Sequence, residues 1–194
     1  SVSREQGRRK SSFCRALMPD VLARYYTDNL KLTSQGQAER MLAEMGLLNM
    51  DEFDKYAESK MPLLKNLMQM SVLNIRKAYQ QNFRQLPRIA SFIGTSNRFD
   101  LLTDPTGSRR FLCIEVKHDI DCTGIEHDRI FAQLKAELIA GRRSWFTKSE
   151  EEELQRHNEA FYRVSLAEEA VRSLFRAPLP AEKSIDLTAA DIFD

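Results

Sequence analysis

Residues 47–52 read Leu47-Leu48-Asn49-Met50-Asp51-Glu52, a short apolar run that ends in two acids. Such a run is typical of a buried strand, because a strand that is covered on both faces does not alternate polar and apolar residues. The two acids then stand at the C-terminal tip of the strand. The stretch therefore predicts a buried strand of a parallel sheet with carboxylates at its tip.

Helices and further strands are predicted on both sides of this strand. Helical patterns cover residues 12–17, 37–45, 61–70, 128–140 and 165–175, with a further apparent helix start after Thr188. Strand patterns cover residues 89–93 and 111–116, and residues 72–79 with residues 80–86 predict a β-ribbon. Because strands alternate with helices, the expected fold is an α/β sheet.

The sequence changes in character near Trp145. An acidic run at residues 150–153, an amphipathic stretch and a proline-containing link follow it. We therefore expect an α/β core over residues 1–144 and a helical appendage over residues 145–194, which is cut short at its end. Trp145 itself is interpreted as a packing residue.

The composition excludes several classes of protein. A chain of 194 residues can bury a large core, and 42% hydrophobic with 29% charged residues is typical of soluble proteins. Twenty-nine Lys and Arg against 28 Asp and Glu leave a net charge of +1, so any site for a polyanion must be a local patch. Cys14, Cys113 and Cys122 lack a CxxC spacing, which favours reduced thiols over a disulfide frame or a zinc site.

A membrane protein is not expected. No window contains the roughly 18 consecutive apolar residues that a membrane-spanning helix needs, and the first 30 residues hold no signal-peptide core. The expected location is therefore the cytoplasm.

A basic segment near the start of the sequence reads Arg4-Glu5-Gln6-Gly7-Arg8-Arg9-Lys10-Ser11. A nucleotide-phosphate loop has the form GxxxxGK followed by Ser or Thr. Its glycines let backbone N–H groups surround the phosphates, its lysine neutralises them and its hydroxyl binds magnesium. Lys10 and Ser11 fit that form, whereas Arg4 and Arg9 replace both motif glycines and only Gly7 relieves the backbone. A weak phosphate loop and an exposed basic terminus both stay open.

Polar residues follow two of the predicted strands. Beside a phosphate loop, Asp51 can anchor the magnesium shell and Glu52 can orient or deprotonate the attacking water. The run Gly94-Thr95-Ser96-Asn97 ends the strand at residues 89–93 and puts Asn97 at the edge where open α/β folds bind ligands. An amide there can hydrogen-bond the γ-phosphate or its water. A common acidic strand end and an ordinary turn are the structural alternatives.

Two arginines follow a segment with strong turn signals. Residues 104–111 read Asp104-Pro105-Thr106-Gly107-Ser108-Arg109-Arg110-Phe111. Arginines presented by a rigid turn suit a finger that stabilises the charge on a transferring phosphoryl group of a neighbouring subunit. The alternative is a pair of solvated surface arginines.

The order of these parts resembles that of an AAA+ type nucleotidase. More specifically, residues 91–97 together with residues 102–111 look like the hallmark of the virulence-associated protein E family. Its members are primase-associated, superfamily 3 helicase-like ATPases of phages, plasmids and mobile islands. The resemblance covers roughly Gln6 to Lys117. It implies a P-loop NTPase fold with a parallel-sheet core, a β-hairpin insertion and a C-terminal helical appendage.

The resemblance also implies a nucleotide site. Lys10 and Ser11 match the Walker A lysine and hydroxyl, and Gly7 and Ser12 belong to the same nucleotide-binding segment. Ser11 and Asp51 would hold Mg²⁺ through the nucleotide.

Catalytic roles are implied in the same way. Asp51 and Glu52 match the Walker B acids, and Asn97 matches the sensor asparagine. Arg109 and Arg110 match the arginine-finger pair, and either of the two is a candidate for the arginine that reaches the nucleotide.

The ribbon at residues 72–88 lies where such proteins carry a hairpin that faces DNA. Arg76, Lys77 and Arg84 are then candidates for DNA contacts, and Tyr79 is a candidate for stacking on a base. An edge hairpin with solvated charges is the structural alternative.

The predicted function is that of a helicase-like domain of a mobile-element primase-helicase, which binds and hydrolyses ATP with Mg²⁺ and acts on DNA. The expected partners are DNA, further copies in a homo-oligomeric ring and a primase module in cis or in trans. A pseudo-ATPase that serves as an assembly or DNA-docking module stays open because the Walker A glycines are absent. A DNA-binding protein that needs no nucleotide is a third reading.

The start of the chain bears on the same choice. Only three residues precede Arg4, which leaves almost nothing for the strand that normally feeds such a loop. We expect either a piece of a longer protein or a degenerate relative.

Overall fold

The computed structural model describes residues 1–3, 5–30, 32, 35–56, 58–76, 82–103, 108–164, 166–176, 182–183 and 188. The chain forms two compact units, Ser1–Tyr162 and Arg163–Asp194. Helix α6 (Leu166–Leu174) belongs to the second unit. Helix α5 (Lys148–Asn158) belongs to the first unit, although the sequence places it in the appendage that begins at residue 145.

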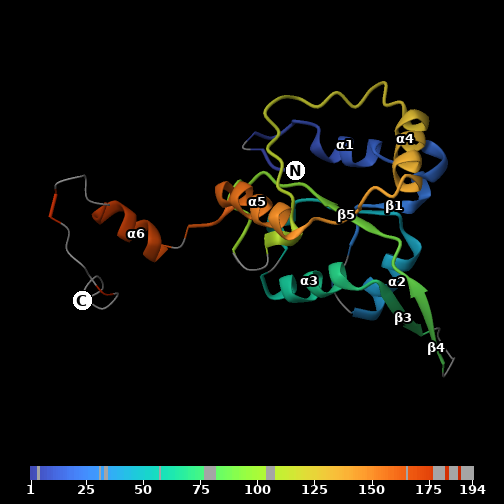
Figure 1. Ribbon diagram of the computed structural model, residues 1–194, viewed down its shortest axis with the longest axis horizontal. Coiled ribbons are helices and arrows are strands. Elements are labelled where there is room, and N and C mark those ends of the chain that lie inside the picture. Colours follow the sequence, from blue (N-terminus) through green and yellow to red (C-terminus); the bar gives the residue numbers. More distant parts are fainter. Residues whose placement is uncertain are drawn as a thin grey trace. The chain divides into compact units, whose positions relative to one another are not determined.

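A parallel sheet forms the centre of the first unit (Figure 1). Its strands are, in spatial order, β1 (Tyr26–Thr27), β2 (Leu47–Met50) and β5 (Ser91–Gly94). Val2 extends the sheet beyond β5, because it forms parallel bridges to Ser96 on one side and to Glu115 on the other. The predicted strands at residues 47–50 and 89–93 are confirmed, whereas the two-residue β1 is an element that the sequence did not predict.

Helices lie on both sides of the sheet, with α1 on one side and α3 on the other in Figure 1. The remaining α-helices are α1 (Lys10–Ala16), α2 (Gln35–Glu44), α3 (Met61–Gln69) and α4 (His127–Ile139). The short 3₁₀-helices are η1 (Asp20–Tyr25), η2 (Phe53–Lys55), η3 (Glu58–Lys60), η4 (Ser108–Arg110) and η5 (Glu159–Phe161). Each of the five predicted helical stretches coincides with an α-helix. Among the described helices, none has the length and apolar character needed to cross a bilayer.

The predicted β-ribbon is confirmed. Strand β3 (Val72–Arg76) pairs with β4 (Phe83–Pro87) in the antiparallel sense, and the turn between them lies outside the described residues. The Arg88 guanidinium donates hydrogen bonds of 2.8 Å to the carbonyl oxygens of Met70 and Ala90. These bonds attach the base of the ribbon to the segments that flank it.

The main core involves the sheet and helices α2 and α3. Leu48 of β2, Leu42 of α2, and Leu64 and Leu67 of α3 are fully buried. Leu64 and Leu67 are three residues apart, so they occupy one face of α3. Burial of each such side chain stabilises the fold by about 1.5–3 kcal/mol, so β2 is held against both helices by apolar contacts.

Residues 111–116 form no regular strand, contrary to the prediction. Only Glu115 is bridged, to Val2, although Val2 also exchanges backbone hydrogen bonds of 2.8 Å with Ile114 and Val116. Val2 is the single bridged residue of the segment beside residues 111–116, so the ladder of backbone hydrogen bonds ends after one bridge. The Ile114 side chain is more than half exposed. An apolar run becomes a strand only where a partner strand satisfies its backbone groups.

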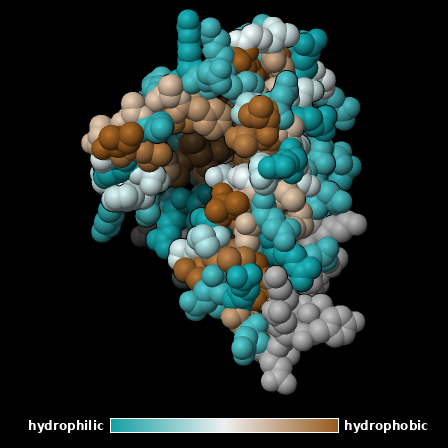
Figure 2. Space-filling model, turned by 90° about the vertical axis from the view of Figure 1, so that its right-hand side faces the viewer, coloured by the Kyte–Doolittle hydropathy of each residue, from teal (hydrophilic) through white to brown (hydrophobic). Residues whose placement is uncertain are grey.

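Helix α4 forms as predicted, but its apolar side is not covered. Phe131, Leu134 and Leu138 are exposed by 43%, 49% and 64%. Figure 2 faces the side of the molecule on which α4 lies in Figure 1, and it shows apolar surface there among polar side chains. The periodicity of apolar residues identifies a helix, but it does not show that another element packs against it.

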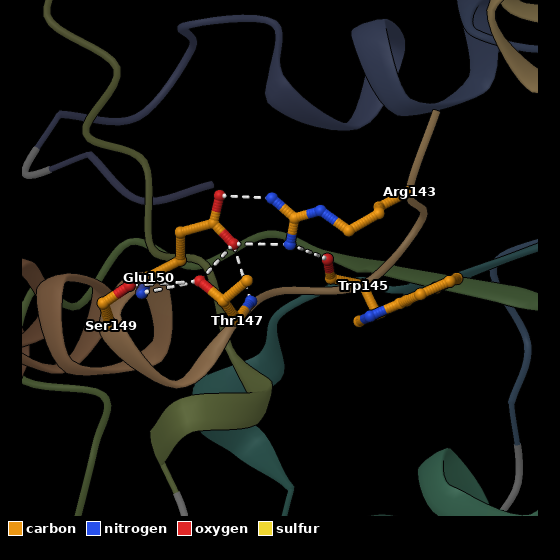
Figure 3. Close-up of polar contacts among 5 residues, drawn as sticks. All are labelled: Arg143, Trp145, Thr147, Ser149 and Glu150. Atoms are coloured by element: carbon orange, nitrogen blue, oxygen red, sulfur yellow. Dashed lines mark hydrogen bonds and ion pairs between the residues drawn. The ribbon is translucent and has the colours of Figure 1, made fainter. Parts of the chain in front are cut away.

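Trp145 is 69% exposed, so its interpretation as a packing residue is wrong. The loop that carries it is held by polar contacts instead. Arg143 donates to both oxygens of the Glu150 carboxylate at 3.0 and 3.1 Å, and Thr147 caps α5 through the backbone N–H of Glu150. Figure 3 shows the Trp145 ring pointing away from these contacts.

Candidate nucleotide-binding site

The segment between Val2 and α1 forms a loop at the edge of the sheet. Val2 is bridged on both sides and Lys10 begins α1, so the chain runs from an extended residue through a loop into a helix. This is the order of elements in a phosphate loop. Gly7 and Arg9 have φ values of 84° and 58°, and such a conformation costs an arginine about 1–2 kcal/mol while glycine adopts it freely. Arg4 lies outside the described residues.

The loop lines a cavity of about 430 Å³ together with the tips of β2 and β5. The residues around this cavity are Gln6, Gly7, Arg8, Arg9, Lys10, Ser11, Ser12, Asp51, Glu52, Thr95, Ser96 and Asn97. They include every predicted nucleotide-binding residue and the predicted catalytic residues Asp51, Glu52 and Asn97. The structure therefore brings together three stretches that lie far apart in the sequence.

Lys10 connects the loop to the tip of β5. Its Nζ donates to Ser3 Oγ at 2.5 Å and to Asn97 Oδ1 at 2.8 Å, and the residue is buried. Burial lowers the pKa of Lys10, although the nearby carboxylates of Asp51 and Asp54 oppose the shift. A cation in this position suits an anionic ligand, which would replace the hydration that burial removes.

Asp51 connects α1 to both strand tips. Its Oδ1 accepts a hydrogen bond of 2.6 Å from Ser11 Oγ and another from Thr95 Oγ1. Partial burial by itself raises the pKa of Asp51, but the bonds from Ser11, Thr95 and the backbone N–H of Glu52 outweigh it and lower the pKa overall. The side chain is thus ionised at neutral pH. An ionised carboxylate beside a hydroxyl supplies the oxygen ligands that Mg²⁺ prefers.

Glu52 lines the cavity in a strained backbone conformation. Its φ of 50° and ψ of 51° are left-handed, and the backbone N–H of Phe53 donates to Thr95 O at 2.8 Å just after it. The Glu52 carboxylate accepts a hydrogen bond of 2.6 Å from Lys55 Nζ. Strain of this kind is maintained only where the surroundings impose it, and it concentrates at functional sites.

Sequence reasoning missed several residues of this site. Thr95 binds Asp51, Ser3 binds Lys10, and Ser96 Oγ donates to Asp54 Oδ1 at 2.5 Å. Thr95 and Ser96 precede Asn97 at the same strand end, so their position was the available signal. Their small polar side chains are also usual in turns, which is why residue type alone did not distinguish them.

The predicted arginine pair lies elsewhere in this chain. Arg109 and Arg110 belong to η4 and do not line the cavity. Arg110 is half-buried and contacts the side-chain amide of Gln69, whose oxygen accepts from Nε at 3.2 Å when it faces the guanidinium. Arg109 is exposed.

The predicted DNA-contact residues are only partly described. Arg84 is exposed on β4, next to Phe83, which is 64% exposed. Arg76 belongs to β3, but its side chain, Lys77 and Tyr79 lie outside the described residues. Their contacts with DNA stay predictions.

A metal site formed by side chains alone is not found in the described part of the chain, which holds no group of three or more His, Cys, Asp and Glu suited to one ion. Cys14, Cys113 and Cys122 are free thiols, and burial raises the pKa of the first two. Ser11 and Asp51 could hold Mg²⁺ only with further oxygen ligands from a nucleotide or water, which is usual for this ion.

Comparison with known proteins gives three findings. No curated protein sequence matches the chain. Two solved structures of the NrS-1 C-terminal region, both described as A form apo structures, have TM-scores of 0.43. The first, CTR(305-718), is 18% identical over 82% of this chain and 33% of that chain. The second is 16% identical over 91% of this chain and 42% of that chain, so the chain spans less than half the length of either.

The third finding concerns the family. The family model of the virulence-associated protein E-like domain matches residues 2–163. The match includes the loop before α1, the tips of β2 and β5, and helices α4 and α5. Because it covers most of the chain, the chain belongs to the virulence-associated protein E-like domain family.

Proposed function

We propose that this domain binds ATP with Mg²⁺ at the cavity beside α1 and hydrolyses it during replication of the DNA of a mobile element. The observation that carries the proposal is the meeting of Lys10, Ser11, Asp51 and Asn97 at one cavity. Two of the contacts among them are hydrogen bonds, of 2.6 Å between Ser11 and Asp51 and 2.8 Å between Lys10 and Asn97. Membership of the family supports the setting in replication.

Each residue has a defined part in the proposed reaction. Lys10 neutralises phosphate charge, and Ser11 with Asp51 holds Mg²⁺, which would offset charge on the phosphates. Glu52 orients the attacking water, and the Asn97 amide hydrogen-bonds the γ-phosphate. The Lys10–Asn97 bond would couple phosphate binding to the sensor side chain, since the ammonium that contacts Asn97 would also contact the phosphate.

A neighbouring copy would supply the arginine that completes the site. Arg109 is the better candidate of the pair, because Arg110 contacts Gln69 of its own chain whereas Arg109 is exposed. A guanidinium added in trans would stabilise charge that develops on the transferring phosphoryl group.

DNA is proposed to contact the ribbon formed by β3 and β4. Phe83 and Arg84 are exposed there, and an aromatic ring beside a cation suits stacking and phosphate contact with single-stranded DNA. Binding of this kind weakens as salt rises, because phosphate contacts release counterions.

The second candidate function is nucleotide binding without turnover. Two observations favour it: Arg9 stands where the loop form has glycine, and the Glu52 carboxylate is already bound by Lys55 at 2.6 Å. A domain of this kind would serve in assembly or in DNA docking.

One experiment separates the two functions. Binding of a fluorescent ATP analogue and release of phosphate are measured with Mg²⁺, with and without single-stranded DNA, for the wild type, Lys10→Ala and Glu52→Gln. The enzyme hypothesis predicts loss of binding in Lys10→Ala and loss of turnover with retained binding in Glu52→Gln. Lys135→Ala, a lysine exposed on α4, serves as the control.

The outcomes are distinct. Binding with no phosphate release by the wild type selects the second candidate. Nucleotide binding that is absent in the wild type, or unchanged in Lys10→Ala, rejects both.

A further inference from the structure

Residues 119–122 lie against the loop that precedes α1. Arg8 Nη1 donates to Asp119 Oδ1 at 2.9 Å, and the backbone N–H of Ile120 donates to the carbonyl oxygen of Arg8 at 3.3 Å. Cys122 Sγ is 4.0 Å from the carbonyl oxygen of Arg9, the distance of a weak thiol contact. This segment therefore contacts two consecutive residues of the loop, through both backbone and side chain.

The chain just before this segment is attached to the sheet, and the C-terminal end of the segment forms a local turn. On the N-terminal side, the backbone N–H of Val116 donates to Val2 O at 2.8 Å, and Val2 is the residue from which the loop leaves the sheet. On the C-terminal side, Asp121 accepts from the backbone N–H and the hydroxyl of Thr123 at 2.9 and 2.7 Å. The contacts with Arg8 are thus made by a segment with a fixed origin and a fixed turn.

The loop needs such support because of Arg9. Its φ of 58° is a conformation in which a residue with a side chain is strained, and a glycine at that position would relieve the strain. Strain persists only when surrounding contacts hold the residue in place. On the C-terminal side of Arg9, the backbone N–H of Phe13 in α1 donates to Arg9 O at 2.9 Å, and residues 119–122 supply contacts to Arg8 and Arg9 from outside the loop.

We propose that residues 119–122, here called the brace segment, hold the loop in its phosphate-binding conformation and so offset the strain of an arginine at position 9. Asp119 is the positioning residue, through its ion pair with Arg8. The importance of that conformation for nucleotide binding rests on the proposed function. The support of the loop by the brace segment does not depend on it. The general phosphate-loop form GxxxxGK has glycine at the position of Arg9, where glycine adopts a positive φ without strain.

Asp119 is the residue to change. It does not line the cavity, whereas Arg8 does, so Asp119→Asn removes the ion pair without removing a group that faces the ligand. Glu126→Gln is the matched control, because Glu126 is an exposed acid paired with Arg129 at 2.9 Å and also lies outside this cavity.

Hydrogen exchange of the backbone amides at residues 5–9 tests the brace without any nucleotide. We expect Asp119→Asn to raise exchange there about two- to fivefold, the range that follows from the free energy of a surface ion pair, and Glu126→Gln to leave it unchanged. In an Arg9→Gly background, where the strain is absent, Asp119→Asn has a smaller effect. A general loss of stability would not depend on the residue at position 9. Equal exchange in the wild type and Asp119→Asn, or an effect of the same size in both backgrounds, overturns the brace.

Binding of a fluorescent ATP analogue then reports on the proposed function separately. A Kd that rises about two- to fivefold in Asp119→Asn and recovers with Arg9→Gly supports the link between the brace and the nucleotide. If the wild type binds no analogue but the variants show the expected exchange pattern, the proposed function is rejected and the proposal of the brace segment stands. An unchanged Kd despite faster exchange overturns the link to the nucleotide.

Discussion

Arg9 and Glu52 are the residues other than glycine with positive φ in the described part of the chain, and both line the same cavity. Each costs about 1–2 kcal/mol relative to a glycine in the same conformation. Strain at two points of one cavity indicates that the surroundings hold the backbone there in a particular arrangement. At Arg9 these surroundings include the brace segment. At Glu52 they include Thr95, whose hydroxyl donates to the Asp51 carboxylate and whose carbonyl oxygen accepts from the backbone N–H of Phe53.

Arg9→Gly is expected to stabilise the protein. Removing the side chain relieves the left-handed conformation, so the free energy of unfolding should rise by about 1 kcal/mol, less the entropy that glycine gains in the unfolded chain. Urea unfolding measures the change. Gln6→Gly, in the same loop but without positive φ, should leave stability unchanged or lower it. An Arg9→Gly protein no more stable than Gln6→Gly contradicts the strain.

At the scale of single residues, the sequence predicted Lys10, Ser11, the two acids and Asn97, but it missed the hydroxyl side chains that bind them. Lys10 and Ser11 belong to a motif with a mechanism, and Asp51 follows a recognisable strand. Thr95 and Ser3 became site residues only through contacts across 44 and 7 positions of the chain. Small hydroxyl side chains are common in turns, so residue type alone did not distinguish them.

Helix α5 shows how an element can be stabilised by its first turn. Thr147 accepts from the backbone N–H of Glu150, and the Glu150 carboxylate accepts from that of Thr147 at 2.6 Å, which is a capping box (Figure 3). The Arg143 guanidinium and the capping bonds hold the pKa of Glu150 at about 2, below its ordinary value of 4.5. The charged form of Glu150 is thus the one that supports α5.

The contribution of Glu150 should depend on pH. Because its folded-state pKa is depressed, its stabilisation is fully present above about pH 4.5 and is lost as pH falls towards about 2. We expect Glu150→Gln to lower the Tm at pH 7 and to match the wild type near pH 2. Thermal unfolding across this range tests it, with Glu152→Gln as the control for loss of an acid from the same helix. A Tm difference that is constant with pH would contradict the role of the charge.

Helices α3 and α4 differ in what their leucines do. Leu67→Ala in α3 removes a fully buried side chain and should cost about 2–5 kcal/mol, including the cavity left behind. Leu134→Ala in α4 removes one that is 49% exposed and should change stability by less than about 0.5 kcal/mol. Urea unfolding of the two variants provides the comparison. Equal costs would mean that the apolar side of α4 is covered in solution.

At the scale of elements, the sequence predicted which strands and helices form better than it predicted which neighbours pair with them or cover them. Residues 47–50 and 111–116 are similar apolar runs, yet only the first is a strand, because β1 and β5 satisfy its backbone groups on both edges. Residues 111–116 are bridged only at Glu115. The apolar period of α4 likewise predicted a helix, but it did not show whether another element covers its apolar side. The sequence of an element does not show which neighbour satisfies its backbone hydrogen bonds or covers its apolar side.

The whole molecule divides after Tyr162 rather than at the change in sequence character near residue 145. Helix α5 and η5 supply Leu154 and Phe161 as buried residues of the first unit. Asn158 is also buried there, and its side-chain amide donates to Phe111 O at 2.7 Å. These contacts attach the segment after residue 145 to the segment that follows η4.

Truncation tests where the first unit ends. A fragment of residues 1–164 should unfold cooperatively with a Tm within a few degrees of the full chain, because it contains the whole first unit. A fragment of residues 1–144 loses Leu154 and Phe161 and should be less stable by at least about 3 kcal/mol. Calorimetry of both fragments measures the difference. Equal stability of the two fragments would place the boundary near residue 145 instead.

The sequence by itself determined local features of this protein: the positions of five of its α-helices, the buried strand at residues 47–50, the β-ribbon and the charged residues of a segment that resembles a phosphate loop. These follow from periodicity and residue type, which act over a few residues. The tertiary structure alone decided that Val2 serves as the strand before the loop, that Thr95 and the brace segment support the cavity, and that α4 and Trp145 stay exposed. Those outcomes depend on which distant segments meet, because hydrogen bonds and burial are completed between neighbours in space.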